Sequence, residues 1–188
     1  IFCSVISVAI IVERFYTLRQ EAITPKNLLN EIINRFKVSG VTQDLISAAQ
    51  VSSPLGRVFV AGLKNIDNTK DAMKEAIEEA GVEVAHELER YLTTLGTIAT
   101  MAPLLGLLGT IIGMIEIFGA STPTGITDPA RLAHGISIAL YNAAFGIIVA
   151  IPSLVFYRHF RSTVDSLTVQ MELQAMKLID LTRGNRAE

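Results

Sequence analysis

Two long apolar stretches dominate the hydrophobic pattern of the chain. Residues 97–119 carry a single ionisable side chain, Glu116, and residues 132–157 are apolar over a similar length. A bilayer core of ~30 Å needs about 20 apolar residues in a helix, so each stretch predicts a transmembrane helix. Residues 1–12 are also apolar, but they rise only ~18 Å as a helix. They are interpreted as a first transmembrane helix that is truncated at its N-terminus.

Polar segments with helical periodicity occupy residues 13–96, which we expect to be a cytoplasmic helical region. Thr24-Pro25 predicts a helix start, Gly40 ends that helix, and Thr42 and Ser53-Pro54 open two shorter helices. From Thr69 onward no breaker interrupts the pattern, so one helix is predicted from about Thr69 to Gly119. Its apolar positions are Met73, Ile77, Ala80, Val84, Leu88, Tyr91 and Leu95.

The C-terminal part repeats this design. Residues 120–131 are rich in turn formers and predict a periplasmic turn, in which Asp128-Pro129 caps the next helix. The tail, residues 158–188, keeps a helical apolar period to about Gly184, through Phe160, Val164, Leu167, Met171, Ala175, Leu178 and Leu181. The predicted fold is an all-α membrane protein with three transmembrane helices, two of which extend as long rods into a cytoplasmic helical bundle.

Small residues form a stripe along the segment 97–119. Ala99, Ala102, Gly106, Gly109 and Gly113 recur at spacings of three and four, which places them on one helix face. Such a face lets a neighbouring helix approach closely. A phosphate-binding loop is disfavoured, because no Lys-Ser/Thr follows the glycines and no strand precedes them.

Composition and charge exclude several classes of function. Half of the residues are hydrophobic and the formal net charge is −2, so no basic surface indicates nucleic-acid binding. The single cysteine, Cys3, has no disulfide partner or metal-ligand companions. No nucleophile–base pair, metal cluster or cofactor loop can be assembled, so we expect neither an enzyme nor a cofactor. Every Lys and Arg except Arg131 lies in residues 13–96 or in the tail, which predicts a periplasmic N-terminus and a cytoplasmic C-terminus.

Glu116 is the main candidate for chemistry. A carboxylate at this depth is costly unless it is paired, protonated or beside a polar cavity. It could line a pore and help protons enter, bond to His134, Ser137 or Asn142 of a neighbouring span, or reach water near Gly119.

Other polar side chains in the apolar stretches leave alternatives open. Thr110 could line a pore or bond to its own helix backbone. His134 could titrate in the physiological range or serve as a surface or packing residue. Asn142 needs a partner across a helix interface. Arg158 and Arg161 are interface anchors that could hold anionic lipid headgroups. The acidic run is interpreted as a solvated helix face: Glu75, Glu78, Glu79, Glu83, Glu87 and Glu89.

The segments 89–115 and 139–158 resemble the ExbB/TolQ proton-channel family, which is more distantly related to MotA, and residues 102–113 are the most specific part. The resemblance implies a proton-channel subunit of the bacterial inner membrane. It also implies a homopentamer whose pore holds an ExbD-like single-span dimer, and proton entry coupled to work on a TonB-like protein. A TolQ- or MotA-like stator, or a membrane scaffold without ion flux, is the alternative.

The chain departs from the family pattern in the third span. The family usually has a Glu and a later Thr there, but the corresponding positions are Ile138 and Ala143. The threonine of the second span is retained as Thr110. Our hypothesis is that Glu116, at a similar depth to Ile138, supplies the missing carboxylate, with Thr110, Asn142, Ala143 and His134 as further pathway candidates.

Overall fold

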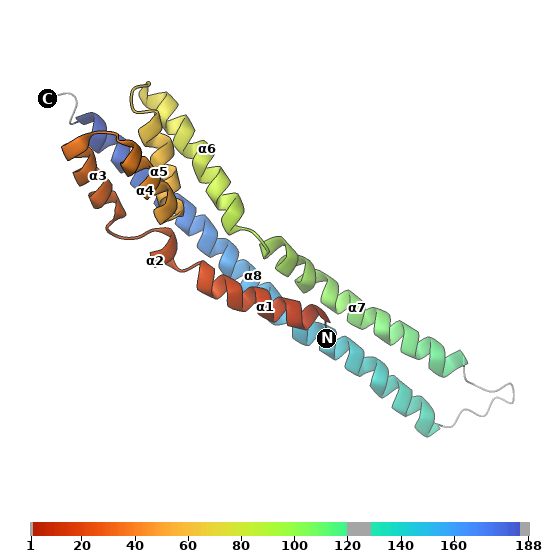
Figure 1. Ribbon diagram of the computed structural model, residues 1–188. Coiled ribbons are helices and arrows are strands. Elements are labelled where there is room, and N and C mark those ends of the chain that lie inside the picture. The colour runs from red at the N-terminus through yellow and green to blue at the C-terminus, as the bar shows by residue number, and fades with distance from the viewer. Residues whose placement is uncertain (1, 120–128, 185–188) are drawn as a thin grey trace. The chain divides into compact units, whose positions relative to one another are not determined.

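The computed structural model describes residues 2–119 and 129–184, and within them every regular element is a helix. Figure 1 shows their order. The helices are α1 (Phe2–Thr17), α2 (Gln20–Ile23), α3 (Leu28–Ser39), α4 (Gln43–Ser52), α5 (Pro54–Lys64), α6 (Lys70–Leu88), α7 (Leu92–Gly119) and α8 (Pro129–Gly184). The all-helical class is therefore confirmed. Of the turn predicted at residues 120–131, residues 120–128 with the Asp128 cap lie outside the described residues, and the prediction is wrong for residues 129–131, which already belong to α8.

The chain forms two compact units. One unit, called here the apolar unit, consists of the residues up to Glu13 and of Tyr91–His159; the other, the bundle unit, consists of Arg14–Arg90 and the residues from Phe160 on. Two described stretches are long and apolar enough to cross a bilayer, Leu92–Gly119 and Leu132–Thr182. α1, with 16 residues, is not among them, so the first transmembrane helix expected at residues 1–12 stays a prediction.

Three of the expected helix starts in the bundle unit are confirmed. The hydroxyls of Thr42, Ser53 and Thr69 each accept a hydrogen bond from a backbone N–H three residues on, at 3.2 to 3.3 Å. These bonds satisfy N–H groups that have no partner within the first turn of a helix. Gly40 ends α3 with a φ of 67°, a conformation that glycine adopts without strain.

The core of the bundle unit is built on α5, which packs against both α4 and α6. Leu55, Val58 and Phe59 of α5 are completely buried. The apolar stripe of α8 contributes too: Phe160, Val164, Leu167, Met171, Ala175 and Leu178 are all buried, as the periodicity predicts. Leu181 is the exception at 52% exposed, because Ile179 and Thr182 occupy the buried face of the final turns.

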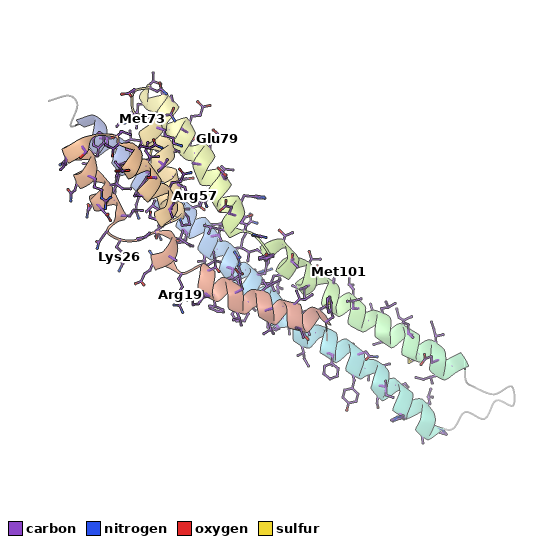
Figure 2. All side chains as sticks on the ribbon, in the orientation of Figure 1. Arg19, Lys26, Arg57, Met73, Glu79 and Met101 are labelled. Atoms are coloured by element: carbon purple, nitrogen blue, oxygen red, sulfur yellow. The ribbon has the colours of Figure 1, made fainter. Side chains whose placement is uncertain are left out.

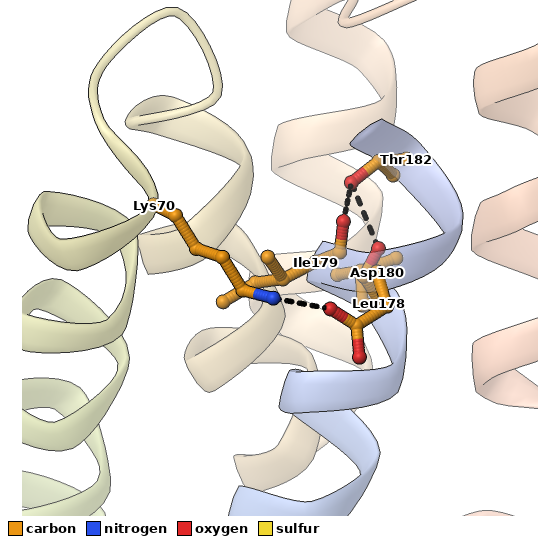
Figure 3. A network of polar contacts seen from close by, with 5 residues as sticks. All are labelled: Lys70, Leu178, Ile179, Asp180 and Thr182. Atoms are coloured by element: carbon orange, nitrogen blue, oxygen red, sulfur yellow. Dashed lines mark hydrogen bonds and ion pairs between the residues drawn. The ribbon is translucent and has the colours of Figure 1, made fainter. Parts of the chain in front are cut away.

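Polar contacts tie α8 to the start of α6. Lys70 Nζ lies 2.8 Å from Asp180 Oδ1, and the Thr182 hydroxyl donates to the carbonyls of Leu178 and Ile179. Figure 3 shows these contacts. The buried hydroxyl is satisfied within its own helix, so Thr182 can lie in an apolar core. Glu79, labelled in Figure 2, is exposed on α6, as expected for a solvated acidic face, whereas Glu87 and Glu89 at the end of the acidic run pair with Arg57 and Arg161.

The expected helix start at Thr24-Pro25 is wrong. Thr24 ends α2: its N–H and its hydroxyl both donate to the carbonyl of Gln20, at 2.8 and 3.2 Å. The side chain is therefore engaged with the preceding turn and does not cap a following one. α3 begins at Leu28, after Asn27.

The expected single helix from Thr69 to Gly119 is also wrong, because it is broken at Glu89–Tyr91. Tyr91 has a φ of 65°, the one positive φ of a non-glycine residue in the part of the chain that the structure describes. For a residue with a side chain, this left-handed backbone conformation is less stable than the right-handed one by roughly 1–2 kcal/mol. The carbonyl of Leu88, which would bond to the N–H of Leu92 in a continuous helix, instead accepts from Arg14 Nη1 at 3.1 Å.

The ion pair of Arg57 and Glu87 predicts a pH dependence of stability. The Arg57 guanidinium donates two hydrogen bonds to the Glu87 carboxylate, at 2.8 and 2.5 Å, and these bonds hold the pKa of Glu87 below its usual range. A lowered pKa in the folded state stabilises above the unfolded pKa of about 4.3, and the effect is lost as pH falls through the folded pKa. We expect Glu87→Gln to lower the free energy of unfolding at pH 7 by less than about 1 kcal/mol, and with it the melting temperature slightly, because the side chains of Arg57 and Glu87 are 32% and 53% exposed. The difference from the wild type should close below about pH 4 in circular dichroism melts.

Candidate proton pathway in the apolar unit

Glycines bring the backbones of α7 and α8 into direct contact. A Cβ atom placed on Gly106 would lie 2.8 Å from the carbonyl oxygen of Asn142, and one on Gly146 would lie 2.6 Å from that of Ala102. Real Cβ atoms do not approach backbone atoms this closely. The small-residue stripe is therefore a helix-packing surface, as the spacing predicts.

The packed glycines also fix the register of the two antiparallel helices, which run side by side in Figure 1. Gly113 faces Ala139, where a Cβ would meet the alanine side chain at 3.5 Å, and Ile117 packs on Gly135. Glu116 lies between these two contacts along α7. Glu116 and Ile138 are consequently within about one helical turn of each other, the relation that our carboxylate hypothesis requires.

Glu116 is exposed on α7. Within residues 2–119 and 129–184, no hydrogen bond joins it to His134, Ser137 or Asn142, and the Ser137 hydroxyl donates to the carbonyl of Ala133 at 3.0 Å. His134 is likewise exposed. The Glu116 carboxylate is therefore accessible from outside the chain, and its role in a proton pathway stays a prediction.

Thr110 lies six residues, or about 1.7 turns, before Glu116 on α7. Its hydroxyl donates to the carbonyl of Leu107 at 2.7 Å, so its proton is used within its own helix. Thr110 also borders a hollow of about 650 Å³ on α7, which Met114 and Phe118 line as well.

The third-span candidates lie at the contact with α7. The backbone of Ala143 meets Gly106, and the side chain of Asn142 lies beside Gly109. Asn142 also borders a cavity of about 720 Å³ between α1, α7 and α8, together with Cys3, Ser4, Leu105, Phe145 and Val149. Sequence reasoning did not identify this cavity, although the glycines that form its wall were visible as the stripe.

Arg158 and Arg161 are both exposed on α8. Arg161 is engaged within the bundle unit: its guanidinium lies 3.3 Å from Glu89 and 3.9 Å from Asp165. Its role as a lipid anchor stays a prediction, and Glu89 and Asp165 partly neutralise its charge.

A buried pair of hydroxyls joins α1 to α8. Ser7 Oγ lies 2.7 Å from Ser153 Oγ, and the Ser153 hydroxyl donates to the carbonyl of Val149, so Ser7 donates to Ser153. We expect the Ser7→Ala and Ser153→Ala variants to show a coupling of about 0.6 kcal/mol in a double-mutant cycle, the average for such bonds between membrane helices. Unfolding of the four proteins in bilayers measures it, and additive single effects would contradict a direct bond.

The apolar unit holds two antiparallel apolar helices that pack through glycines and carry one exposed carboxylate, Glu116. These features are those of a helical membrane protein with a candidate proton-binding group. The chain belongs to the MotA/TolQ/ExbB proton channel family, whose model matches residues 50–173. This is a family of transport proteins and not of enzymes.

Curated relatives agree with this family. The chain is 32% identical over 163 residues to a putative biopolymer transport protein ExbB-like 3 of Synechocystis, covering 85% of this chain and 77% of that protein. It is 28% identical to a putative ExbB homolog of Methanothermobacter thermautotrophicus, covering 86% of this chain but 57% of the relative. It is 26% identical to the biopolymer transport protein ExbB of Salmonella typhimurium, with 85% and 66% covered.

Proposed function

We propose that this protein is an ExbB-like motor subunit of the bacterial inner membrane, which works with an ExbD-like partner to convert proton motive force into work on a TonB-like protein. Five copies would surround two single-span partner helices. The N-terminus would face the periplasm and the C-terminus the cytoplasm.

The observation that carries the proposal is the exposed carboxylate on a tightly packed apolar hairpin. An ionised group in the hydrocarbon core costs several kcal/mol on its own, so membrane proteins retain it where it faces water, a partner or a proton path. Glu116 is exposed on α7, and Thr110, six residues earlier, is half-buried. The Glu116 carboxylate is therefore available to helices of other subunits.

The outer faces of the hairpin support assembly with further helices. Large apolar side chains of α7 and α8 are about half exposed, including Leu104, Leu108, Ile111, Phe145 and Ile148. Met101, labelled in Figure 2, is exposed in the same way. In a membrane these faces would contact lipid or other copies of the chain, whereas the α7–α8 contact is already filled by glycine backbones.

The central proton chemistry would belong to the partner. The apolar stretches of α7 and α8 hold one acidic residue, Glu116, and it lies near the end of α7 rather than at its middle. A residue at this place suits proton entry or exit at the outer face. Transfer at the midplane would need a carboxylate from an ExbD-like helix.

The experiment that tests the proposal is purification of the chain together with the products of its neighbouring genes, followed by mass determination of the intact complex. A pentamer that contains a small single-span partner is expected. Proton uptake into vesicles that hold the complex should depend on this partner.

A stable monomer without a single-span partner would contradict the motor assignment. A complex without proton flux would favour a membrane scaffold instead. A complex with flux but without a TonB-like protein would favour a TolQ- or MotA-like stator.

A further inference from the structure

The last turn of α6 is held by arginines from three other helices. Arg14 of α1 donates to the carbonyl of Leu88, and Arg57 of α5 forms its two hydrogen bonds with Glu87. Arg161 of α8 lies 3.3 Å from Glu89. Cations are favourable at the C-terminal end of a helix, where carbonyl groups lack partners within the helix.

Arg14 is the central member of this arginine clamp, which consists of Arg14, Arg57 and Arg161. Its side chain is only 4% exposed, whereas the side chains of Arg57 and Arg161 are 32% and 50% exposed. A buried guanidinium must use its donors, because leaving them unsatisfied is costly. The carbonyl of Leu88 is one of the acceptors that it uses, and this is the group that would bond to Leu92 if α6 continued into α7.

Two opposing influences therefore meet at residues 89–91. The sequence favours a continuous helix, since it contains no Pro or Gly there, and the left-handed conformation of Tyr91 opposes the break. The arginine clamp favours the break, because Arg14 takes the place of the Leu92 N–H. Residues 89–91 therefore have two competing structures, a continuous helix and a break between α6 and α7.

We infer that residues Glu89–Tyr91 form a two-state joint, broken when Arg14 binds the carbonyl of Leu88 and helical when Arg14 leaves it. Arg14 is then a positioning residue that decides where α6 ends. A change in the surroundings of Arg14 would then alter the end of α6 through its bond to the Leu88 carbonyl. The inference concerns the described residues of the chain itself and is independent of the proposed motor function.

Site-resolved hydrogen exchange of the full chain in lipid nanodiscs tests the joint. In the broken form the Leu92 N–H has lost its Leu88 acceptor, whereas in the helical form that bond protects it from exchange. We expect Arg14→Met to slow exchange at Leu92 by about tenfold or more, in line with the strength of a hydrogen bond to a charged group. Arg19→Met is the matched control and should leave the rate unchanged, because Arg19 is exposed and stacks over the Tyr16 ring at 5.0 Å.

A second substitution tests the strain. Glycine adopts a positive φ freely and is a poor helix former, so the double variant Arg14→Met with Tyr91→Gly should return the Leu92 exchange to the wild-type rate. Failure to return would overturn the inference, as would a wild-type rate in folded Arg14→Met.

If Arg14→Met does not accumulate in membranes, Arg161→Met becomes the deciding variant. It removes an exposed member of the arginine clamp and leaves the buried core intact. Exchange at Leu92 should then slow by about twofold, as expected for the small energy of an exposed ion pair. An unchanged rate in that variant would overturn the inference.

Discussion

Gly106→Ala should destabilise the α7–α8 hairpin strongly, although it adds a single methyl group. That group would meet the Asn142 carbonyl oxygen at 2.8 Å, the Ala143 Cα at 3.1 Å and the Gly146 Cα at 3.3 Å. All three are backbone atoms and cannot rotate away, so the helices must separate. The expected cost is roughly 1–3 kcal/mol, the range for overpacking a well-filled interface. Thermal unfolding of the detergent-solubilised protein, followed by circular dichroism, measures it.

Gly113→Ala is the matched control in the same helix and the same stripe. Its methyl group would meet the Ala139 side chain at 3.5 Å, an ordinary van der Waals contact. Its melting temperature should equal that of the wild type or exceed it slightly, because alanine is the better helix former. Equal melting temperatures for the two variants would show that the hairpin is not packed as tightly as the structure indicates.

Glu116→Gln should reduce partner-dependent proton uptake by about tenfold or more, the scale on which a positioned proton-transfer group contributes. The amide keeps the size and polarity of the side chain but cannot bind and release a proton. Proton uptake into vesicles that contain the assembled complex measures the effect, with complex abundance determined in parallel. Glu116→Asp should retain part of the activity.

Glu79→Gln is the control for charge alone, since Glu79 is an exposed carboxylate on α6. It should leave proton uptake unchanged. Normal uptake by Glu116→Gln at normal abundance of the complex would remove Glu116 from the proton pathway. Loss of the complex itself would instead indicate a structural role in subunit contact.

Local signals predicted most of the fold. The caps at Thr42, Ser53 and Thr69 and the stop at Gly40 depend on a few adjacent residues, so the sequence identifies them directly. The buried stripe of α8 follows from a period that continues over many turns. The errors at Thr24 and at residues 89–91 differ in origin: Thr24 bonds to the carbonyl of Gln20 in the turn just before it, which is a local effect, whereas Arg14, 74 positions away from Leu88, bonds to the Leu88 carbonyl where the long helix is broken.

The candidate site was predictable in its composition but not in its contacts. Spacing alone identified the small-residue stripe, and the lone acid of the span identified Glu116. The bond between Ser7 and Ser153 joins residues 146 positions apart, which no local pattern encodes. Arg14 follows Ile10 by four residues and precedes Leu18 by four, and all three are buried. This helical spacing could have shown that the arginine faces inward.

Because α7 and α8 meet largely through small residues, their mutual fit depends little on the large apolar side chains that point away from the contact. Substitutions among those outward side chains can accumulate without loosening the hairpin. Related chains can therefore change the proteins that they contact in the membrane while keeping the same pair of helices. The choice of partner and the packing of α7 on α8 can then evolve independently.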